Sequence, residues 1–355
     1  MTCREIFRAE GLPVLQNRMF RSKSEALSSP TGDVVLIQDE KTGLIHNAAF
    51  DPSKLIYDHD YQNEQAYSLI FKRHLDDVAE IIARHLKGKR LIEVGCGKGY
   101  FLECLQGRGF DITGIDPAYE GVNPRVVKAS FQKELGLSGQ GIILRHVLEH
   151  IPNPVVFLNE IANANGGEGT IYIEVPSFDW IADHRAWFDL FYEHANYFRP
   201  SDFFRIFGKV YESGLIFGKQ YFYVLADLAS LRTPARDNTD QAELPKDFLA
   251  GIDRAVDLIR NTPHRKHVVW GGASKGAIFS IYLGRVGITP DQVIDINPAK
   301  QGRYLAVSGL KVLAPDEALP LLSPGDNIFV MNSNYLNEII FQSGNRYTYT
   351  TVEHE

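Results

Sequence analysis

Cysteine is scarce in this sequence: its 355 residues include only Cys3, Cys96 and Cys104. Three thiols are too few for a disulfide framework, so we expect them to stay reduced. Long apolar runs are missing as well: no stretch of about 18 uncharged apolar residues occurs, and the sequence therefore predicts no membrane-spanning helix. The first residues, MTCREIFRAEGL, lack the apolar centre of a secretory leader. A cytoplasmic location is the expectation.

Positive charge is also in short supply. The chain has 37 Lys and Arg residues against 44 Asp and Glu, a net charge of −7, whereas a general nucleic-acid-binding surface is normally basic. We therefore expect a small-molecule partner rather than nucleic acid or a membrane. A hydrophobic content of 44% and a charged content of 23% are those of an ordinary globular protein. The length exceeds that of one usual domain and predicts two or three.

The first 60 residues consist of short apolar runs between turns, such as GDVVLIQ and TGLIHN, and this pattern predicts a small β-rich module. Domains of this size often depend on a metal, but no spacing typical of metal ligands occurs, and His46, His59 and His74 are interpreted as ordinary histidines. From residue 61 onward, apolar residues at three- and four-residue steps predict a helix with Leu69 in its buried stripe. The cluster YDHDY at 57–61 forms either a lid over a ligand or a cap on this helix.

The most informative stretch is LIEVGCGKGY, residues 91–100, which predicts a buried strand, a glycine-rich turn and a helix. The glycines Gly95, Gly97 and Gly99 allow the backbone to pass close to a ligand. The next apolar strand ends at Asp116, where an acid can hold two ribose hydroxyls. The turn therefore predicts a nucleotide-type cofactor.

Two cofactors compete for this turn. The dinucleotide fingerprint is G-x-G-x-x-G/A, with pyrophosphate on the helix N-terminus, but here the third glycine comes one position early and residue 100 is Tyr. S-adenosylmethionine has no phosphate and carries a sulfonium cation, so the acid Glu93 beside the turn suits it. The pattern resembles motifs I and II of class I methyltransferases. S-adenosylmethionine is the expected cofactor, with NAD or a purely structural turn as the alternatives.

Strands then alternate with helices of about ten residues, which predicts an α/β fold with a parallel, doubly wound, Rossmann-like sheet. Ligands bind beyond the carboxyl ends of such strands, and Glu174 also falls at one of these ends. The candidate cofactor-binding residues are Glu93, Gly95, Gly97, Gly99, Asp116, Arg145 and His146.

A segment rich in aromatic residues follows, and it contains Tyr192, Glu193, His194 and Tyr197. Imidazole is the side chain best suited to proton transfer near neutral pH, and a neighbouring carboxylate can change its proton affinity. The Glu-His pair is therefore a candidate catalytic pair. The alternative is the start of a helix capped by Ser201, with the pair exposed.

The polar segment LRTPARDNTDQAELPK marks a domain boundary, and residues 245–355 predict a second α/β unit. Its turn from Gly272 to Gly276 offers backbone N–H groups, the Ser274 hydroxyl and the Lys275 cation. These groups form either a phosphate cradle or a turn whose glycines only pack. The spacing is not that of a P-loop. A strand in this unit ends near Asn297.

Six stretches in order resemble the sugar C-methyltransferase family over nearly the whole chain: YDHDYQNEQAYSLIFKRHL, EVGCGKGYFL, HVLEHIPNP, YEHANYF, WGGASKG and DINPAKQGRY. The resemblance implies transfer of a methyl group from S-adenosylmethionine to a carbon of a nucleotide-linked keto-deoxysugar. It also implies three parts: a zinc-binding-like module at 1–60, a methyltransferase domain at 61–228 and a substrate-binding domain at 245–355. An O- or N-methyltransferase and a non-catalytic nucleotide-binding protein are the alternatives.

The resemblance also implies roles for individual residues. His194 would be the base that takes a proton from the carbon beside the keto group, and Glu193 would orient it or contact the substrate. Tyr192 and Tyr197 would stabilise the enolate, although many family members have a tyrosine where this chain has Phe191. The implied substrate contacts are Tyr61, Gln65, Ser274, Lys275 and Asn297.

The zinc ligands of the family are largely missing. The family's module holds zinc with four cysteines, but here Cys3 stands alone with Ile6 at its partner position, and the second pair falls near Asp39 and Thr42. One thiolate cannot form a tetrahedral zinc site. We therefore expect a module that keeps its fold without a metal.

Overall fold

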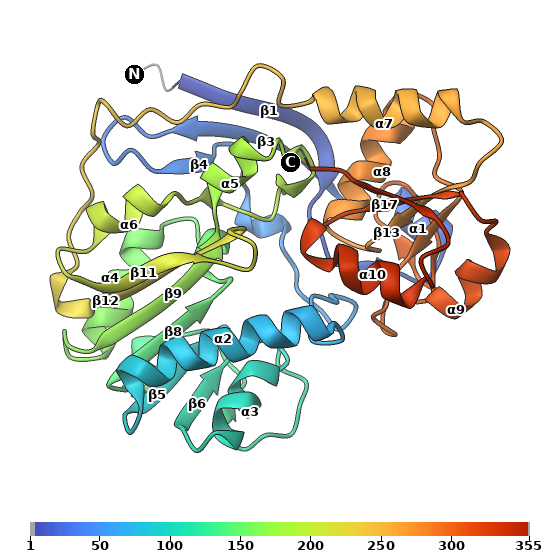
Figure 1. Ribbon diagram of the computed structural model, residues 1–355. Coiled ribbons are helices and arrows are strands. Elements are labelled where there is room, and N and C mark those ends of the chain that lie inside the picture. The colour runs from blue at the N-terminus through green and yellow to red at the C-terminus, as the bar shows by residue number, and fades with distance from the viewer. Residues whose placement is uncertain (1–3, 354–355) are drawn as a thin grey trace.

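The computed structural model describes residues 4–353 and contains three main sheets (Figure 1). The predicted α/β class is confirmed. Among the described residues, no helix is long and apolar enough to cross a membrane. Cys3, the one cysteine left from the zinc pattern, lies outside the described residues.

The central sheet has seven strands in the order β11-β12-β9-β8-β5-β6-β7, and five of them, β5 to β9, run parallel. Its strands are β5 (Arg90–Val94), β6 (Asp111–Ile115), β7 (Val126–Val127), β8 (Gly141–Arg145), β9 (Thr170–Pro176), β11 (Val210–Ile216) and β12 (Tyr221–Asp227). Its helices are α2 (Leu69–Leu86), α3 (Tyr100–Gly107), α4 (Pro154–Ala164), α5 (Phe178–Asp183) and α6 (Pro200–Ile206).

The sheet is mixed rather than wholly parallel, which corrects the expectation from the sequence. β12 pairs antiparallel with both β9 and β11. The reason is the tight turn between β11 and β12, where Phe217, Gly218 and Lys219 all have positive φ. Because so short a connection can join only antiparallel strands, β12 must reverse direction.

Helix α2 begins eight residues later than the sequence suggested. Ser68 is its N-cap, and the Ser68 hydroxyl accepts a hydrogen bond from the Phe71 N–H. Its buried face includes Phe71, Leu75 and Val78, whereas Leu69, expected in the buried stripe, is 63% exposed. Residues 57–61 therefore do not cap this helix.

The N-terminal sheet, β1-β3-β4-β10, includes a strand from the middle of the chain, because β10 contains Tyr197. β2 in turn pairs with β15 near the C-terminus, so the N-terminal residues contact both other parts. The elements are β1 (Arg4–Pro13), β2 (Met19–Phe20), α1 (Lys23–Leu27), β3 (Thr31–Gln38), β4 (Ile45–Asn47) and β10 (Asn196–Tyr197). The domain boundaries given above stay predictions.

The C-terminal sheet is parallel, in the order β16-β14-β13-β17-β18. Its strands, with the separate β15, are β13 (His267–Trp270), β14 (Gln292–Ile294), β15 (Tyr304–Leu305), β16 (Val312–Leu313), β17 (Asn327–Val330) and β18 (Thr348–Thr351). The helices are α7 (Ala250–Asn261), α8 (Lys275–Arg285), α9 (Pro315–Ala318) and α10 (Leu336–Gln342).

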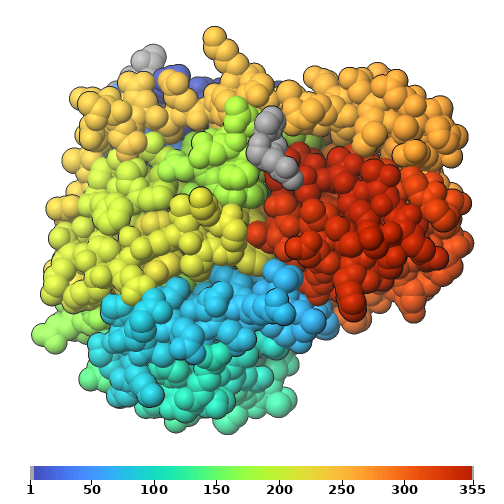
Figure 2. Space-filling view, viewed as in Figure 1, coloured from blue at the N-terminus to red at the C-terminus, as the bar shows by residue number. Residues whose placement is uncertain are grey.

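The C-terminal unit closes against the first turn of α2 (Figure 2). Glu338 on α10 accepts hydrogen bonds from the Ser68 hydroxyl at 2.5 Å and from the Leu69 N–H at 3.1 Å. The Tyr335 hydroxyl donates to Gln65 Oε1 at 3.0 Å. These contacts hold the central sheet and the C-terminal sheet on opposite sides of one internal space.

Candidate active site

One cavity of about 600 Å³ lies beyond the carboxyl ends of the parallel strands of the central and C-terminal sheets, which is the usual ligand position in such sheets. Its wall includes residues from all three parts of the chain. Most of the residues singled out in the sequence line it: Tyr61, Gln65, Glu93, Gly95, Gly97, Asp116, Arg145, His146, Glu193, His194, Ser274 and Lys275. Gly99, Tyr192, Tyr197 and Asn297 do not.

The glycine turn after β5 has the backbone that only glycine adopts easily. Gly95, Gly97 and Gly99 have φ values of 74°, 55° and 83°. A Cβ on Gly95 would lie 2.3 Å from Val147 Cγ2, whereas a Cβ on Gly97 would meet no atom within 4 Å. The Gly97 N–H donates to Asp116 Oδ2 at 2.8 Å. The turn and the acid at the end of β6 therefore form one unit with open space in front of it.

Glu93 carries the strongest sign of a cationic ligand. It is 2% exposed, and its Oε2 atom has no hydrogen-bond partner within residues 4–353. Burial raises the pKa of the Glu93 carboxyl to about 7, although the nearby Arg145 guanidinium opposes this change. A buried carboxylate without a partner is costly. A bound ammonium or sulfonium group would stabilise it, so the site fits the cofactor expected from the sequence.

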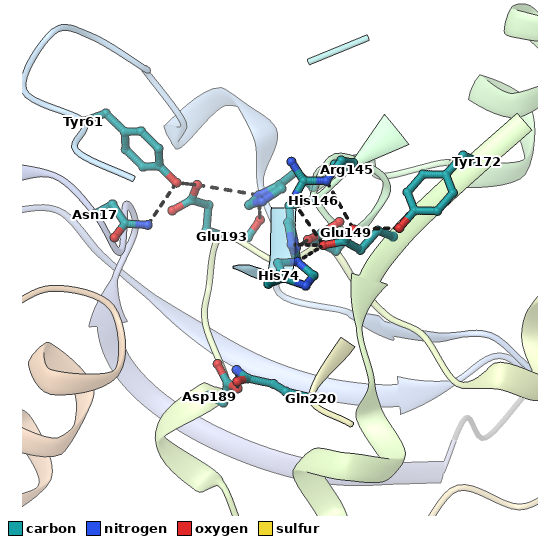
Figure 3. Close-up of polar contacts among 12 residues, drawn as sticks. Asn17, Tyr61, His74, Arg145, His146, Glu149, Tyr172, Asp189, Glu193 and Gln220 are labelled. Atoms are coloured by element: carbon teal, nitrogen blue, oxygen red, sulfur yellow. Dashed lines mark hydrogen bonds and ion pairs between the residues drawn. The ribbon is translucent and has the colours of Figure 1, made fainter. Parts of the chain in front are cut away.

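Glu174, near the end of β9, is the centre of a buried polar cluster, and its partners His74, Arg145, His146 and Tyr172 are labelled in Figure 3. It accepts hydrogen bonds from His74 at 2.9 Å, His146 at 3.0 Å, Tyr172 at 2.9 Å and Arg145 at 3.2 Å. Burial alone would raise the pKa of Glu174, but Arg145 and the two histidines hold it well below its ordinary value. Glu174 is therefore an anion that holds Arg145 and His146 in place.

His146 joins this cluster to a second carboxylate. It has a φ of 51°, and its Nδ1 atom lies 3.5 Å from Glu149 Oε1. Burial alone would lower the pKa of His146, but the hydrogen bonds with Glu149 and Glu174 raise it to about 9. His146 is therefore an imidazolium at neutral pH, between two carboxylates.

Glu193 is fully buried and accepts three hydrogen bonds. The donors are the Gln16 N–H at 2.9 Å, the Tyr57 hydroxyl at 3.0 Å and the Tyr61 hydroxyl at 2.5 Å. Figure 3 shows the bond from Tyr61. Burial, and then the negative charge of Glu193, raise the pKa of both tyrosines. Residues 57–61 therefore cover the cavity and direct two phenol groups toward it.

His194 is 4% exposed and lines the cavity, so the interpretation of the Glu-His pair as exposed is wrong. Its ring packs edge-on against Phe191 and His150, with centroids 5.2 Å and 5.0 Å away. Burial, and then the charges of His150 and His146, hold the pKa of His194 well below its ordinary value. No hydrogen bond forms to this ring within residues 4–353. The neutral imidazole therefore has a free lone pair.

Tyr192 and Tyr197 use their hydroxyls elsewhere. The Tyr192 hydroxyl accepts from the Asp51 N–H at 2.9 Å. The Tyr197 hydroxyl bonds the backbone of Phe191, accepting from N–H and donating to C=O at 2.8 Å each. The phenol groups that line the cavity and contact Glu193 belong to Tyr57 and Tyr61, and only Tyr61 was among the predicted site residues.

The polar groups of the C-terminal glycine turn bond to other groups of the protein. The Gly272 N–H donates to Asp295 at 2.8 Å, and the Ser274 N–H donates to the Gln16 carbonyl at 2.8 Å. The Lys275 ammonium lies 2.9 Å from Asp189, which also accepts from Gln220. Asn297 does not line the cavity, and its side-chain amide donates to the Glu64 carbonyl at 3.1 Å.

Packing explains one glycine of this turn outright. A Cβ on Gly276 would lie 1.8 Å from the Gly271 carbonyl oxygen. Of the two interpretations of the turn, packing therefore accounts for Gly276, whereas the side chains of Ser274 and Lys275 line the cavity.

A family model described as "Methyltransferase domain" matches residues 57–210. No curated protein matches the sequence. Similar solved structures include the plantazolicin methyltransferase BpumL, with 20% identity over 34% of this chain and 52% of that chain and a TM-score of 0.28. The chain thus spans about half the length of BpumL.

For two further solved structures, the match covers nearly the whole of the compared chain. The PH0226 protein from Pyrococcus horikoshii OT3 is 11% identical over 47% of this chain and 97% of that chain, with a TM-score of 0.35. A SAM-dependent methyltransferase from Archaeoglobus fulgidus is 16% identical over 45% of this chain and 100% of that chain, with a TM-score of 0.34.

The domain match and the cavity agree with each other. The matched residues contain the glycine turn, Asp116, the Glu174 cluster and the Glu193–His194 pair. Of the two cofactors that competed for the turn, the match decides for S-adenosylmethionine. Residues 57–210 are therefore a class I S-adenosylmethionine-dependent methyltransferase domain.

Proposed function

We propose that the chain methylates a carbon beside the keto group of a nucleotide-linked deoxysugar. The observation that carries this proposal is the neutral, unbonded imidazole of His194 on the wall that also holds the glycine turn. A carbon beside a ketone becomes a nucleophile only after it loses a proton, and a positioned imidazole is suited to take it. S-adenosylmethionine, when bound, supplies the electrophilic methyl group.

The chain's own residues divide the remaining work. Glu93, the Gly95–Gly97 turn and Asp116 hold the cofactor, with Glu93 against its positive charge. Glu193 holds the hydroxyls of Tyr57 and Tyr61 on the wall of the cavity that His194 also lines. Either hydroxyl can turn its proton from Glu193 toward the enolate oxygen, where a donor stabilises the developing charge. This proposal gives Tyr57 and Tyr61 the role that the family resemblance implied for Tyr192 and Tyr197.

A specific observation favours a second candidate, transfer to an oxygen or nitrogen of a sugar or related small molecule. Three of the cations on the cavity wall already have acidic partners: Lys275 with Asp189 at 2.9 Å, Lys300 with Asp295 at 3.2 Å, and Arg145 with Glu174 at 3.2 Å. A diphosphate would have to compete for these cations. An acceptor without phosphates avoids that competition, and His194 can deprotonate a hydroxyl as well.

One panel of acceptors separates the two candidates. The purified protein receives S-adenosylmethionine with an isotope-labelled methyl group, together with nucleotide-linked keto sugars, the same keto sugars without the nucleotide, and their reduced hydroxyl forms. Carbon NMR of the product distinguishes a new C–CH₃ from an O–CH₃ or N–CH₃ group. Label found only on oxygen or nitrogen would overturn the leading proposal in favour of the second.

The base is tested by His194→Ala. We expect turnover to fall by a factor of about 10²–10⁴, the usual contribution of a positioned base, while the affinity for S-adenosylmethionine stays within about twofold. His264→Ala, which removes an exposed histidine of the C-terminal unit, is the matched control and should keep full turnover. Turnover of His194→Ala close to that of the control would exclude His194 as the base.

A further inference from the structure

Three side chains on the cavity wall bring one metal-binding atom each within 4.8 Å of one another: Glu149, His150 and His194. Glu149 and His150 belong to a short 3₁₀ helix after β8, and His194 precedes β10. The fold therefore joins the two segments HVLEHI and YEHA, which lie more than forty residues apart in the printed sequence. All three residues face the cavity.

One carboxylate oxygen of Glu149 has no hydrogen-bond partner among the described residues. The residue is 2% exposed, and its Oε1 atom lies 3.5 Å from His146 Nδ1. Its Oε2 atom is buried and has no hydrogen-bond partner among the described residues. Leaving a buried carboxylate oxygen without a partner is unfavourable. A cation beside Oε2 would remove this penalty.

His150 has its ring oriented as in metal-binding histidines. Its Nδ1–H donates to the Glu193 carbonyl oxygen at 3.2 Å, and this hydrogen bond leaves the lone pair on Nε2. Metal-ligating histidines usually donate their other ring N–H to a carbonyl or carboxylate in the same way. The contact of His146 with Glu149 supports the carboxylate ligand similarly.

His194 completes the set. Its ring is buried, carries no hydrogen bond from residues 4–353 and lines the cavity beside Glu149 and His150. Two imidazoles and one carboxylate form a donor set that holds Zn²⁺ and leaves a position open. Ligands of a tetrahedral Zn²⁺ lie about 3.3 Å apart, so side-chain rotations of modest size would bring these three atoms onto one ion.

We propose that Glu149, His150 and His194 bind a divalent first-row cation, best matched by Zn²⁺, and that this cation blocks methyl transfer by occupying the His194 lone pair. The blocking rests on the proposed function, since it requires His194 to act as the base. The binding of the cation does not depend on the proposed function. A metal-loaded chain would be an inhibited form, and the acceptor and the cation would exclude each other.

Binding is tested on the full chain after treatment with a chelator. The protein is dialysed against Zn²⁺, and the bound metal is measured by mass spectrometry. We expect one ion per chain, with affinity reduced at least tenfold in Glu149→Gln and in His150→Asn. Glu160→Gln and His264→Ala, at exposed positions, are the matched controls and should bind as the original chain does. Circular dichroism checks that each variant is folded.

Two outcomes would overturn the site: no stoichiometric Zn²⁺, or an affinity unchanged in both Glu149→Gln and His150→Asn. Co²⁺ adds a second measurement, because its visible absorption reports coordination by nitrogen and oxygen ligands. That spectrum should appear in the original chain and disappear in His150→Asn. Its persistence in the variant would place the metal elsewhere.

Blocking is tested by turnover with and without Zn²⁺. We expect Zn²⁺ to abolish methyl transfer, a chelator to restore it, and the remaining turnover of Glu149→Gln to lose its sensitivity to Zn²⁺. Zn²⁺ that binds but leaves turnover unchanged, or increases it, would overturn the blocking. If no acceptor is methylated at all, the proposed function fails, while the dialysis experiment still decides the metal site.

Discussion

Replacing Glu174 with glutamine keeps the shape of this side chain and removes one buried negative charge. Arg145 and His146, which are both partly buried, would then remain as cations whose main partner is neutral. Removing one member of a buried ion pair typically destabilises a protein by about 3–5 kcal/mol, because the remaining charge loses its compensation. We therefore expect a large loss of stability from Glu174→Gln.

The pKa of His146 gives a separate magnitude. Its value of about 9 lies well above the ordinary 6.5, and this interval, at about 1.36 kcal/mol per pH unit, corresponds to about 3 kcal/mol. The raised pKa stabilises the folded state fully below pH 6.5, and this contribution is lost as the pH rises from 6.5 to 9. Because Glu149 also raises the pKa of His146, Glu174→Gln should remove a large part of this stabilisation rather than all of it.

The assay is urea unfolding of both proteins at several pH values between 6 and 9. We expect the transition midpoint of Glu174→Gln to fall most at pH 6 and the difference from the original chain to narrow toward pH 9. Glu160→Gln, which removes an exposed carboxylate on α4, is the control. A free energy of unfolding within about 1 kcal/mol of the original at pH 6, below the range expected for a buried pair, would refute the reasoning.

Two further predictions concern the cofactor site. Gly97→Ala, at a φ of 55°, should weaken S-adenosylmethionine binding at least tenfold in calorimetry. The control is Gly136→Ala, which lies outside the cavity at a φ of 62°, carries similar backbone strain and should bind the cofactor normally. Equal affinity in the two variants would contradict the assignment of the Gly97 turn to the cofactor. The affinity should also rise between pH 6 and 8 as the Glu93 carboxyl, with a pKa of about 7, ionises. Glu93→Gln should remove that pH dependence, and a flat profile in the original chain would exclude Glu93 as the partner of the positive charge.

The part of the site that sequence analysis predicted is the part that depends on local backbone. The positive φ of Gly95 and Gly97 and the acid at the end of the next strand follow from short-range spacing. The direction of β12 does not. It depends on the turn at Phe217–Lys219, where two of three residues with positive φ are not glycine, so the sequence carries little signal for that turn.

The residues that sequence analysis missed depend on contacts between distant segments. Gln16 acts through its backbone, which no side-chain pattern reveals. Tyr57 was considered only as part of a lid or cap, and its role follows from the hydrogen bond to Glu193. His74 offered one signal: a polar residue on the buried face of α2, between Phe71 and Val78. Such a position suggests a buried partner, but only the fold identifies Glu174 as that partner.

The backbone of Gln16 contacts two distant parts of the site. Its N–H donates to the Glu193 carboxylate, and its carbonyl accepts from Ser274 in the C-terminal turn. A shift of the C-terminal unit would therefore displace Gln16 and, with it, the Glu193 carboxylate that accepts from the two tyrosines. The position of Glu193 therefore depends on a turn just over eighty residues beyond it in the printed sequence. Inserting one residue beside Gln16 would disturb both contacts together.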